Sequence, residues 1–157
     1  MKSGAKSVDA YTPRRRNTPI AKSRPRKQYA ALPLAEHGGR TSVMLITSRE
    51  TRRWVIPKGN PERGLEPHAL AAKEAFEEAG LVGRVGSAPV GSFSYAKRLA
   101  AGGTVPVEVK VFPLLVEGQL DDWPEKGQRE TRWFAPGEAA LLVQEGGLAE
   151  LLLSLVD

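Results

Sequence analysis

The sequence predicts an α+β fold, in the broad α/β class, with a mixed β-sheet sandwiched between helices in a single domain. Strand-like apolar runs at 29–34 and 41–47 precede a long helix and do not alternate with it. Valine occupies every second position of 105–111, a period of two that indicates a strand with one buried face. At 157 residues, 41% of them hydrophobic, the chain has the length and apolar content of one packed domain.

Residues 1–26 are predicted to be a disordered basic tail, followed by a folded domain over 27–157. Residues 1–27 contain nine Lys or Arg and one Asp, so this segment accounts for the net charge of +5. Three prolines, at positions 13, 19 and 25, argue against a mitochondrial targeting helix. We expect a solvated tail, and the alternative is a contact between its positive charge and nucleic acid or an acidic partner.

Composition also restricts the compartment. The chain has no cysteine, which excludes disulfides and cysteine-bound zinc. No apolar run reaches the roughly 18 residues of a membrane span, and the N-terminus lacks the apolar segment of a secretory signal. We expect a soluble cytoplasmic protein, monomeric or homodimeric, that does not contact a membrane.

The first predicted strands, 29–34 and 41–47, form a hairpin around His37-Gly38-Gly39, and a third short strand follows at 54–56. A helix is predicted from Pro67 to Gly80, because proline suits the first helical position and glycine the left-handed cap. Helical periodicity places one set of residues on a packing stripe: Ala69, Ala72, Phe76 and Ala79. It places another set on the opposite side: Glu74, Glu77 and Glu78.

After the helix, strands are predicted at 90–97 and 105–115 around a turn at 100–103. Pro106 and Pro113 indicate that parts of the second strand lie at an edge or a bulge. A last strand is predicted at 129–134, a short helix from Pro136, and a leucine-rich helix at 148–156.

The three helix glutamates favour a cation site. Glu74 repels both Glu77 and Glu78 along the helix, and the sequence offers Lys73 alone as a nearby counter-charge. A hard cation with oxygen ligands suits such a cluster, Mg²⁺ first and Mn²⁺ as the alternative. A solvated acidic face is the competing interpretation. The preceding Pro57-Lys58-Gly59 favours the cation, because it predicts a tight turn that presents a backbone carbonyl and a lysine beside the carboxylates.

These residues resemble the Nudix box, a glycine, five residues, a glutamate, seven residues and then REUxEExGU, where U is aliphatic. Gly59 matches the first glycine, and 73–81, KEAFEEAGL, matches the second half in register. Two positions depart from the pattern: Leu65 replaces the first glutamate, and Lys73 replaces the arginine and loses its planar fork. Glu62 or Glu66 is an alternative source of the missing carboxylate.

The resemblance implies the roles of the site residues. Glu74 and Glu78 would bind the metal directly, Glu77 would bind a second metal or its waters, and Lys58 or Gly59 would add a backbone carbonyl. The catalytic set would be Glu74, Glu77 and Glu78 with Glu125, and either Glu74 or Glu125 would accept the proton of the attacking water. Four residues would contact substrate phosphates: Ser48, Arg49, Lys58 and Arg129.

Flanking residues 47–57 and 121–134 resemble the diphosphoinositol polyphosphate and diadenosine polyphosphate phosphohydrolase branch of the family. The resemblance implies Mg²⁺-dependent cleavage of a diphosphate linkage in a small phosphorylated substrate. A dinucleoside polyphosphate is expected to fit better than a diphosphoinositol, because Glu130 and Thr131 stand among the basic residues and the folded part is net acidic. The alternatives are a catalytically weakened Nudix-fold module that binds a nucleotide or protein, and an RNA 5′-pyrophosphohydrolase that uses the basic tail.

Overall fold

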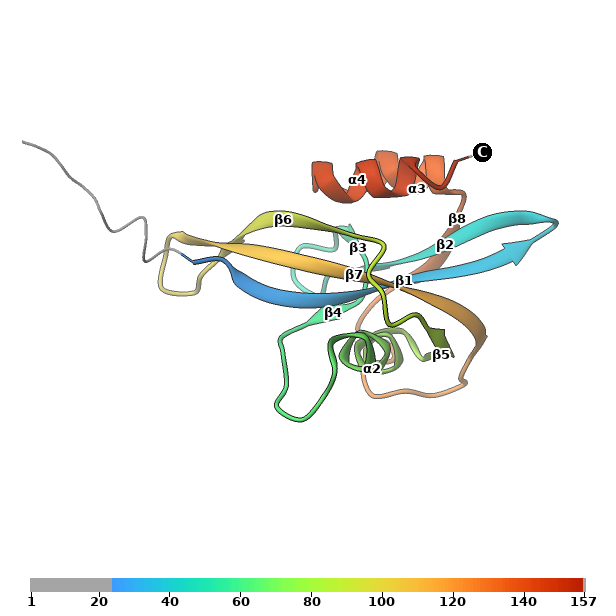
Figure 1. The fold of residues 1–157 in the computed structure, drawn as a ribbon, viewed down its shortest axis with the longest axis horizontal. Coiled ribbons are helices and arrows are strands. Elements are labelled where there is room, and N and C mark those ends of the chain that lie inside the picture. Colours follow the sequence, from blue (N-terminus) through green and yellow to red (C-terminus); the bar gives the residue numbers. More distant parts are fainter. Residues whose placement is uncertain (1–23, 157) are drawn as a thin grey trace, which may run out of the picture.

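A computed structural model describes residues 24–156 and shows one mixed sheet with helices on both faces (Figure 1). Helix α2 (Pro67–Ala79) covers one face, and α3 (Pro136–Leu142) and α4 (Gly146–Leu153) cover the other. The predicted tail lies outside the described residues except for its last three, of which Arg26 already begins the first strand. The predicted fold class is confirmed. Within residues 24–156, no helix is long and apolar enough to cross a membrane.

The sheet is built around two long strands, β1 (Arg26–His37) and β7 (Thr104–Gln119), which run parallel to each other. Strand β2 (Arg40–Thr47) pairs antiparallel with β1 through the predicted hairpin, whose Gly38 and Gly39 have φ of 59° and 78°. The main strand order is β3-β2-β1-β7-β5, while β4 pairs with β1, β6 with β7 and β8 with β2. The remaining strands are β3 (Trp54–Val55), β4 (Lys58–Gly59), β5 (Leu81–Val85), β6 (Gly91–Arg98) and β8 (Thr131–Phe134).

Every predicted helix and strand is present, with ends that differ by a few residues, whereas β4 and β5 were not predicted. Strand β4 has two residues, too few for any periodicity. Strand β5 buries Leu81 and exposes the next three residues, so it lacks an alternating pattern. Both exist because a neighbouring long strand supplies their hydrogen-bonding partners.

Pro106 and Pro113 were expected to mark an edge or a bulge, and the structure bears this out only locally, because β7 as a whole lies inside the sheet between β1 and its antiparallel partners. Each proline occupies a place where one side of β7 needs no donor. Pro113 faces the junction at which the partner changes from β6 to β5, and its carbonyl accepts from Gly86 N–H at 2.9 Å. Pro106 lies one residue outside the β1 pairing, which begins opposite Val107.

The predicted packing face of the long helix was partly wrong. Ala79 of the predicted stripe is fully buried, but Phe76 is 36% exposed, whereas Ala71 and Ala75, which the prediction left out, are fully buried against the sheet. Glu78 shares this buried stripe, since positions 71, 75, 78 and 79 fall on one side of a helix. Alanines occur on several sides of this helix, so the sequence does not indicate which side is buried. The position of the sheet determines which side packs.

Glycines bring α4 close to the sheet. A Cβ on Gly147 would lie 2.7 Å from the Cβ of Phe93 in β6, and one on Gly91 would overlap the Leu151 side chain. One hydrophobic core lies between α2 and the sheet, and a second lies between the sheet and α3 and α4. In the second core, Leu148 and Leu152 of α4 are buried against β6 and β7. The N-terminus of α4 is therefore held near the end of β6.

The helix orientation gives a direct test. Replacing Ala75 by Leu should overpack the interface with the sheet and lower the free energy of unfolding by about 1–3 kcal/mol. Replacing Phe76 by Ser should change it by less than about 1 kcal/mol, because the ring is largely outside the core. Urea denaturation of both variants measures the difference, and a larger loss for Phe76→Ser would contradict the observed packing.

Candidate active site

A pair of carboxylates from α2 lies against the short strand β4. A Cβ placed on Gly59 would come within 2.6 and 2.7 Å of the two carboxylate oxygens of Glu74, so only glycine leaves room for this side chain. Glu78, one helical turn later, accepts a hydrogen bond from the Lys58 backbone N–H at 3.4 Å. The two carboxylates are close enough for the negative charge of Glu74 to raise the pKa of Glu78. Predicted residues 58, 59, 74 and 78 therefore converge.

Arg129 supplies the counter-charge that the sequence did not reveal. Its Nη2 lies 3.7 Å from Glu78 Oε2, and its Nε lies 3.0 Å from Glu125 Oε1. Its Nη1 donates to the Thr47 carbonyl at 3.3 Å. The Arg129 and Glu78 side chains are each 10% exposed, so they form a largely buried ion pair. The Arg129 guanidinium has three partners in all: Glu78, Glu125 and the Thr47 carbonyl.

Burial dominates the protonation of this pair. The pKa of Glu78 is raised to about 8, chiefly by burial and then by the negative charges of Glu74 and Glu125, against the opposing effect of Arg129. Burial also raises the pKa of Glu74, and the charges of Glu77, Glu62 and Glu125 add to it. Without a cation, the pair therefore retains a proton near neutral pH.

This donor set fits a divalent cation. Two adjacent buried carboxylates require positive charge to balance them, and Arg129 supplies only part of it. A hard divalent cation would supply the rest and would take the place of the shared proton. Across residues 24–156, no three carboxylate or imidazole groups are already gathered as a metal cluster. Bound substrate and water would have to complete the coordination, which is the usual situation for Mg²⁺ at a phosphate site.

Glu77 does not join the pair. Its carboxylate is 33% exposed and lies 4.0 Å from Lys73 Nζ, which binds Glu62 more closely at 2.8 Å. Glu62 therefore reaches Lys73 and not the cation site. Glu77 influences Glu74 through its charge, and its proposed role with a second metal stays a prediction.

The loop that carries Glu125 is anchored on the end of α2. Gly80 has φ of 70°, and a Cβ there would lie 2.5 and 3.0 Å from two atoms of the Trp123 ring. Backbone hydrogen bonds join Leu120 N–H to the Gly80 carbonyl at 2.8 Å and Glu125 N–H to the Glu77 carbonyl at 3.0 Å. Gly80 therefore ends the helix and also seats the loop, which places Glu125 near both paired glutamates.

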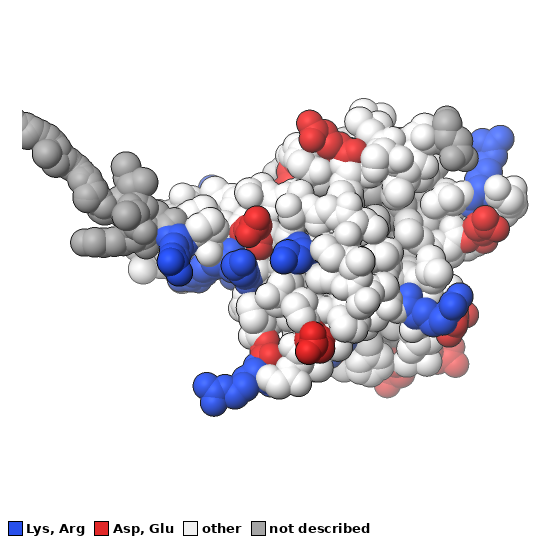
Figure 2. Space-filling view, viewed as in Figure 1, with Lys and Arg blue, Asp and Glu red and all other residues white. Residues whose placement is uncertain are grey.

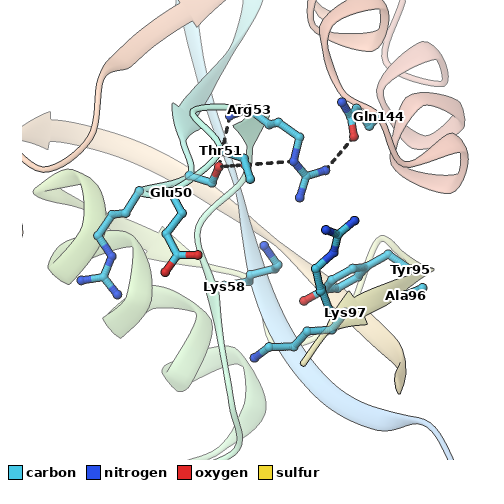
Figure 3. Close-up of a pocket in the computed structure, with 11 residues that line it drawn as sticks. Glu50, Thr51, Arg53, Lys58, Tyr95, Ala96, Lys97 and Gln144 are labelled. Carbon is cyan, nitrogen blue, oxygen red and sulfur yellow. Dashed lines mark hydrogen bonds between the residues drawn. The ribbon is translucent and has the colours of Figure 1, made fainter. Parts of the chain in front are cut away.

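A pocket of about 820 Å³, lined largely by basic side chains, opens beside Lys58 of β4 (Figure 3). Arg53, Lys58 and Lys97 point toward a common space in this pocket. Burial lowers the pKa of Lys58, whose Nζ lies 5.4 Å above the Tyr95 ring. We call this space the cation-lined pocket; its charged lining residues are Arg49, Glu50, Arg53, Lys58, Lys97 and Arg98. By contrast, basic and acidic side chains are interspersed on the face drawn in Figure 2.

The predicted phosphate contacts divide between this pocket and the carboxylates. Ser48, Arg49 and Lys58 line the pocket, although the Ser48 hydroxyl already accepts the Arg53 backbone N–H at 3.1 Å. Arg49 donates to the Gln128 side chain at 3.1 Å and so joins the two loops that flank the site. Arg129 is instead held by the carboxylates and Thr47, so its contact with substrate stays a prediction.

Sequence reasoning assigned no site role to the basic and aromatic lining residues Arg53, Tyr95, Lys97 and Arg98. Three of them come from β6, where a tyrosine followed by two adjacent basic residues is typical of an ordinary exposed strand end. The basic loop 49–53 carried a signal, but its nearness to β6 depends on the pairing of β7 with both β1 and β6.

Comparison with known proteins agrees with the geometry. A family model described as the NUDIX domain matches residues 24–154. Nudix hydrolase 21, chloroplastic, from Arabidopsis thaliana is 30% identical over 76% of this chain and 59% of its own length. Diphosphoinositol polyphosphate phosphohydrolase 3-beta from Bos taurus is 30% identical over 65% and 59%. The C. elegans Ap4A hydrolase structure superimposes with a TM-score of 0.56 at 18% identity, covering 83% of this chain and 95% of that one. The chain thus spans about half to three-fifths of the curated relatives it matches.

The raised pKa of Glu78 predicts a pH-dependent stability. In EDTA, the protonated folded state is favoured, so this stabilisation is present below pH 4.5, the ordinary value, and is lost as the pH rises through about 8. The melting temperature of the wild type should therefore fall between pH 6 and 9 relative to that of Glu78→Gln. Parallel pH profiles for the two proteins would contradict this, and Mg²⁺ should reduce the difference by replacing the proton.

The contact of Gly80 with Trp123 can be tested separately from the left-handed backbone conformation of Gly80. Gly80→Ala adds both left-handed strain and a clash with Trp123, whereas Gly38→Ala adds strain alone, because no atom lies within 4 Å of the Cβ position. We expect Gly80→Ala to cost about 1–3 kcal/mol more in urea denaturation than Gly38→Ala. Equal losses would show that the packing of Trp123 against Gly80 contributes nothing to the free energy of unfolding.

Proposed function

The chain belongs to the Nudix family, and we propose that it is a pyrophosphohydrolase that cleaves a diphosphate linkage in a small phosphorylated substrate with the help of a divalent cation. The proposal concerns the activity, the cation and the substrate of this chain. Its support comes from the geometry on the two sides of β4.

The observation that carries the proposal is that the two residues of β4 contact different parts of the site. Lys58 extends into the cation-lined pocket, and Gly59 lies against the Glu74 carboxylate. A phosphate bound by Lys58 would consequently lie beside a cation bound by Glu74 and Glu78. Hydrolysis of a diphosphate needs this juxtaposition, because the cation must reach the phosphate oxygens that become more negative as the bond breaks.

The residues then have distinct roles. Glu74 and Glu78 would hold the cation, Mg²⁺ or Mn²⁺, which when bound neutralises phosphate charge and makes a coordinated water more acidic. Arg53 and Lys58 would orient the phosphates through charge-assisted hydrogen bonds. Glu125 is the better proton acceptor of the two candidates, because Glu74 is committed to the cation, while the ion pair with Arg129 at 3.0 Å holds Glu125 beside the paired glutamates.

The charge of the cation-lined pocket also indicates how many phosphates the substrate carries. The net acidity of the folded part suggested few phosphates, yet five cations from loop 49–53, β4 and β6 gather around one space with a single acidic lining residue, Glu50. This favours a substrate with several phosphates, a dinucleoside polyphosphate or a diphosphoinositol polyphosphate. The matched bovine relative is named for the second class. The role of the tail and a cytoplasmic location stay predictions.

A hydrolysis panel tests the proposal. Diadenosine polyphosphates, diphosphoinositols, sugar nucleotides and nucleoside triphosphates are incubated with the protein in Mg²⁺ or EDTA, and the products are separated by ion-exchange chromatography. We expect Mg²⁺-dependent cleavage of at least one of the first two classes. Glu78→Gln should reduce kcat by about 10²-fold or more. Full activity of this variant, or activity in EDTA, would exclude the site.

A matched pair of lysine variants separates the pocket from general charge. Lys58→Met should raise KM at least tenfold, because it removes a buried cation from the cation-lined pocket. Lys110→Met removes an exposed lysine of β7 and should leave KM unchanged. Equal effects would mean that the pocket does not bind the phosphates.

A further inference from the structure

Behind the wall of the cation-lined pocket lies a buried carboxylate that the proposed chemistry does not use. Glu145 immediately precedes α4, and its side chain is only 7% exposed. Its Oε2 lies 3.7 Å from Arg53 Nη1. Its Oε1 is buried without a hydrogen-bond partner among residues 24–156. It also lines a smaller cavity of about 340 Å³ that shares Arg53 and Tyr95 with the larger pocket.

A buried and half-satisfied carboxylate is costly, so its position needs a physical reason. The glycine contact between Gly147 and Phe93 forces the N-terminus of α4 onto β6 and delivers Glu145 to the back of this wall. The surrounding charges repay part of the cost, because Glu145 stabilises the ammonium of Lys58 and thereby raises its pKa against the effect of burial. Glu145 thus acts on two cations of the pocket, Arg53 and Lys58.

Glu145 is not needed to hold Arg53 in place. The Arg53 guanidinium donates to Gln144 Oε1 at 2.8 Å and to Thr51 Oγ1 at 3.1 Å, both shorter than its distance to Glu145. What Glu145 adds is negative charge behind the cations. Such a charge repels an anionic ligand in the pocket, and the repulsion increases with every further negative charge on that ligand.

We infer that Glu145 is a specificity-determining residue that limits the negative charge of the substrates accepted by the cation-lined pocket. The inference rests on the proposed function, since it assumes that the pocket receives the phosphates. It favours substrates with few charges beyond the reacting diphosphate, such as dinucleoside polyphosphates, over ring substrates that carry a phosphate at nearly every position.

The test is the dependence of binding on ligand charge. Inorganic pyrophosphate, tripolyphosphate and tetrapolyphosphate are titrated into the protein in EDTA by calorimetry, for wild type and Glu145→Gln. We expect the affinity of Glu145→Gln to exceed that of the wild type by a factor that grows about two- to fivefold with each added phosphate. A purely structural role would change all three affinities by the same factor.

Two further variants control the result. Gln144→Glu places a second carboxylate in the wall itself and keeps the acceptor for Arg53, so it should produce the opposite trend even if Glu145→Gln is poorly folded. Glu150→Gln makes the same change of net charge at an exposed position of α4 and should match the wild type.

The outcomes are distinguishable. If the wild type binds the three polyphosphates and the affinity ratios are unchanged in Glu145→Gln and Gln144→Glu, the inference is wrong while the pocket assignment stands. If the wild type binds none of them, both the pocket assignment and the inference are overturned. Opposite trends in the two variants, with no effect of Glu150→Gln, would support the inference.

Discussion

The site depends on the burial of Glu78 in the packed face of α2. A carboxylate on this face is unfavourable unless positive charge or a proton accompanies it, and the structure provides Arg129 from the far end of the chain. Arg129 in turn binds Glu125, whose loop is seated on Gly80 at the end of the same helix. Through the contacts of Arg129 with Glu78, Glu125 and the Thr47 carbonyl, one buried charge thus links the helix, the loop 120–130 and β2.

The same constraint explains the construction of β4. Glu74 fits only because position 59 has no side chain, and the Lys58 N–H is directed at Glu78. Since Lys58 extends to the opposite side, the strand separates a negative region from a positive one over two residues. Such close opposition of charge suits a reaction in which a cation and a polyphosphate must meet. It also explains why a carboxylate behind the positive wall, such as Glu145, would affect selectivity.

Much of the fold followed from local sequence signals. The hairpin glycines, Pro67 and Gly80, and the alternating valines of β7 each act over a few residues, and each predicted its element correctly. The failures had a common cause. The packing side of α2 and the tolerance of Pro106 and Pro113 inside β7 depend on neighbours that are distant in sequence, and a helix whose buried stripe is mostly alanine offers little phase information of its own.

The sequence by itself determined the boundaries of the main helix, the spacing that puts Glu74 and Glu78 one turn apart, and the glycine at 59, because helix geometry and glycine chemistry are local properties. Only the tertiary structure decided that Arg129 neutralises Glu78, that Arg53 joins Lys97 and Arg98 of β6 in one pocket, and that Glu145 stands behind them. Charges interact through space, and the distances between them are set by the order in which the strands pair, which no short stretch of the chain encodes.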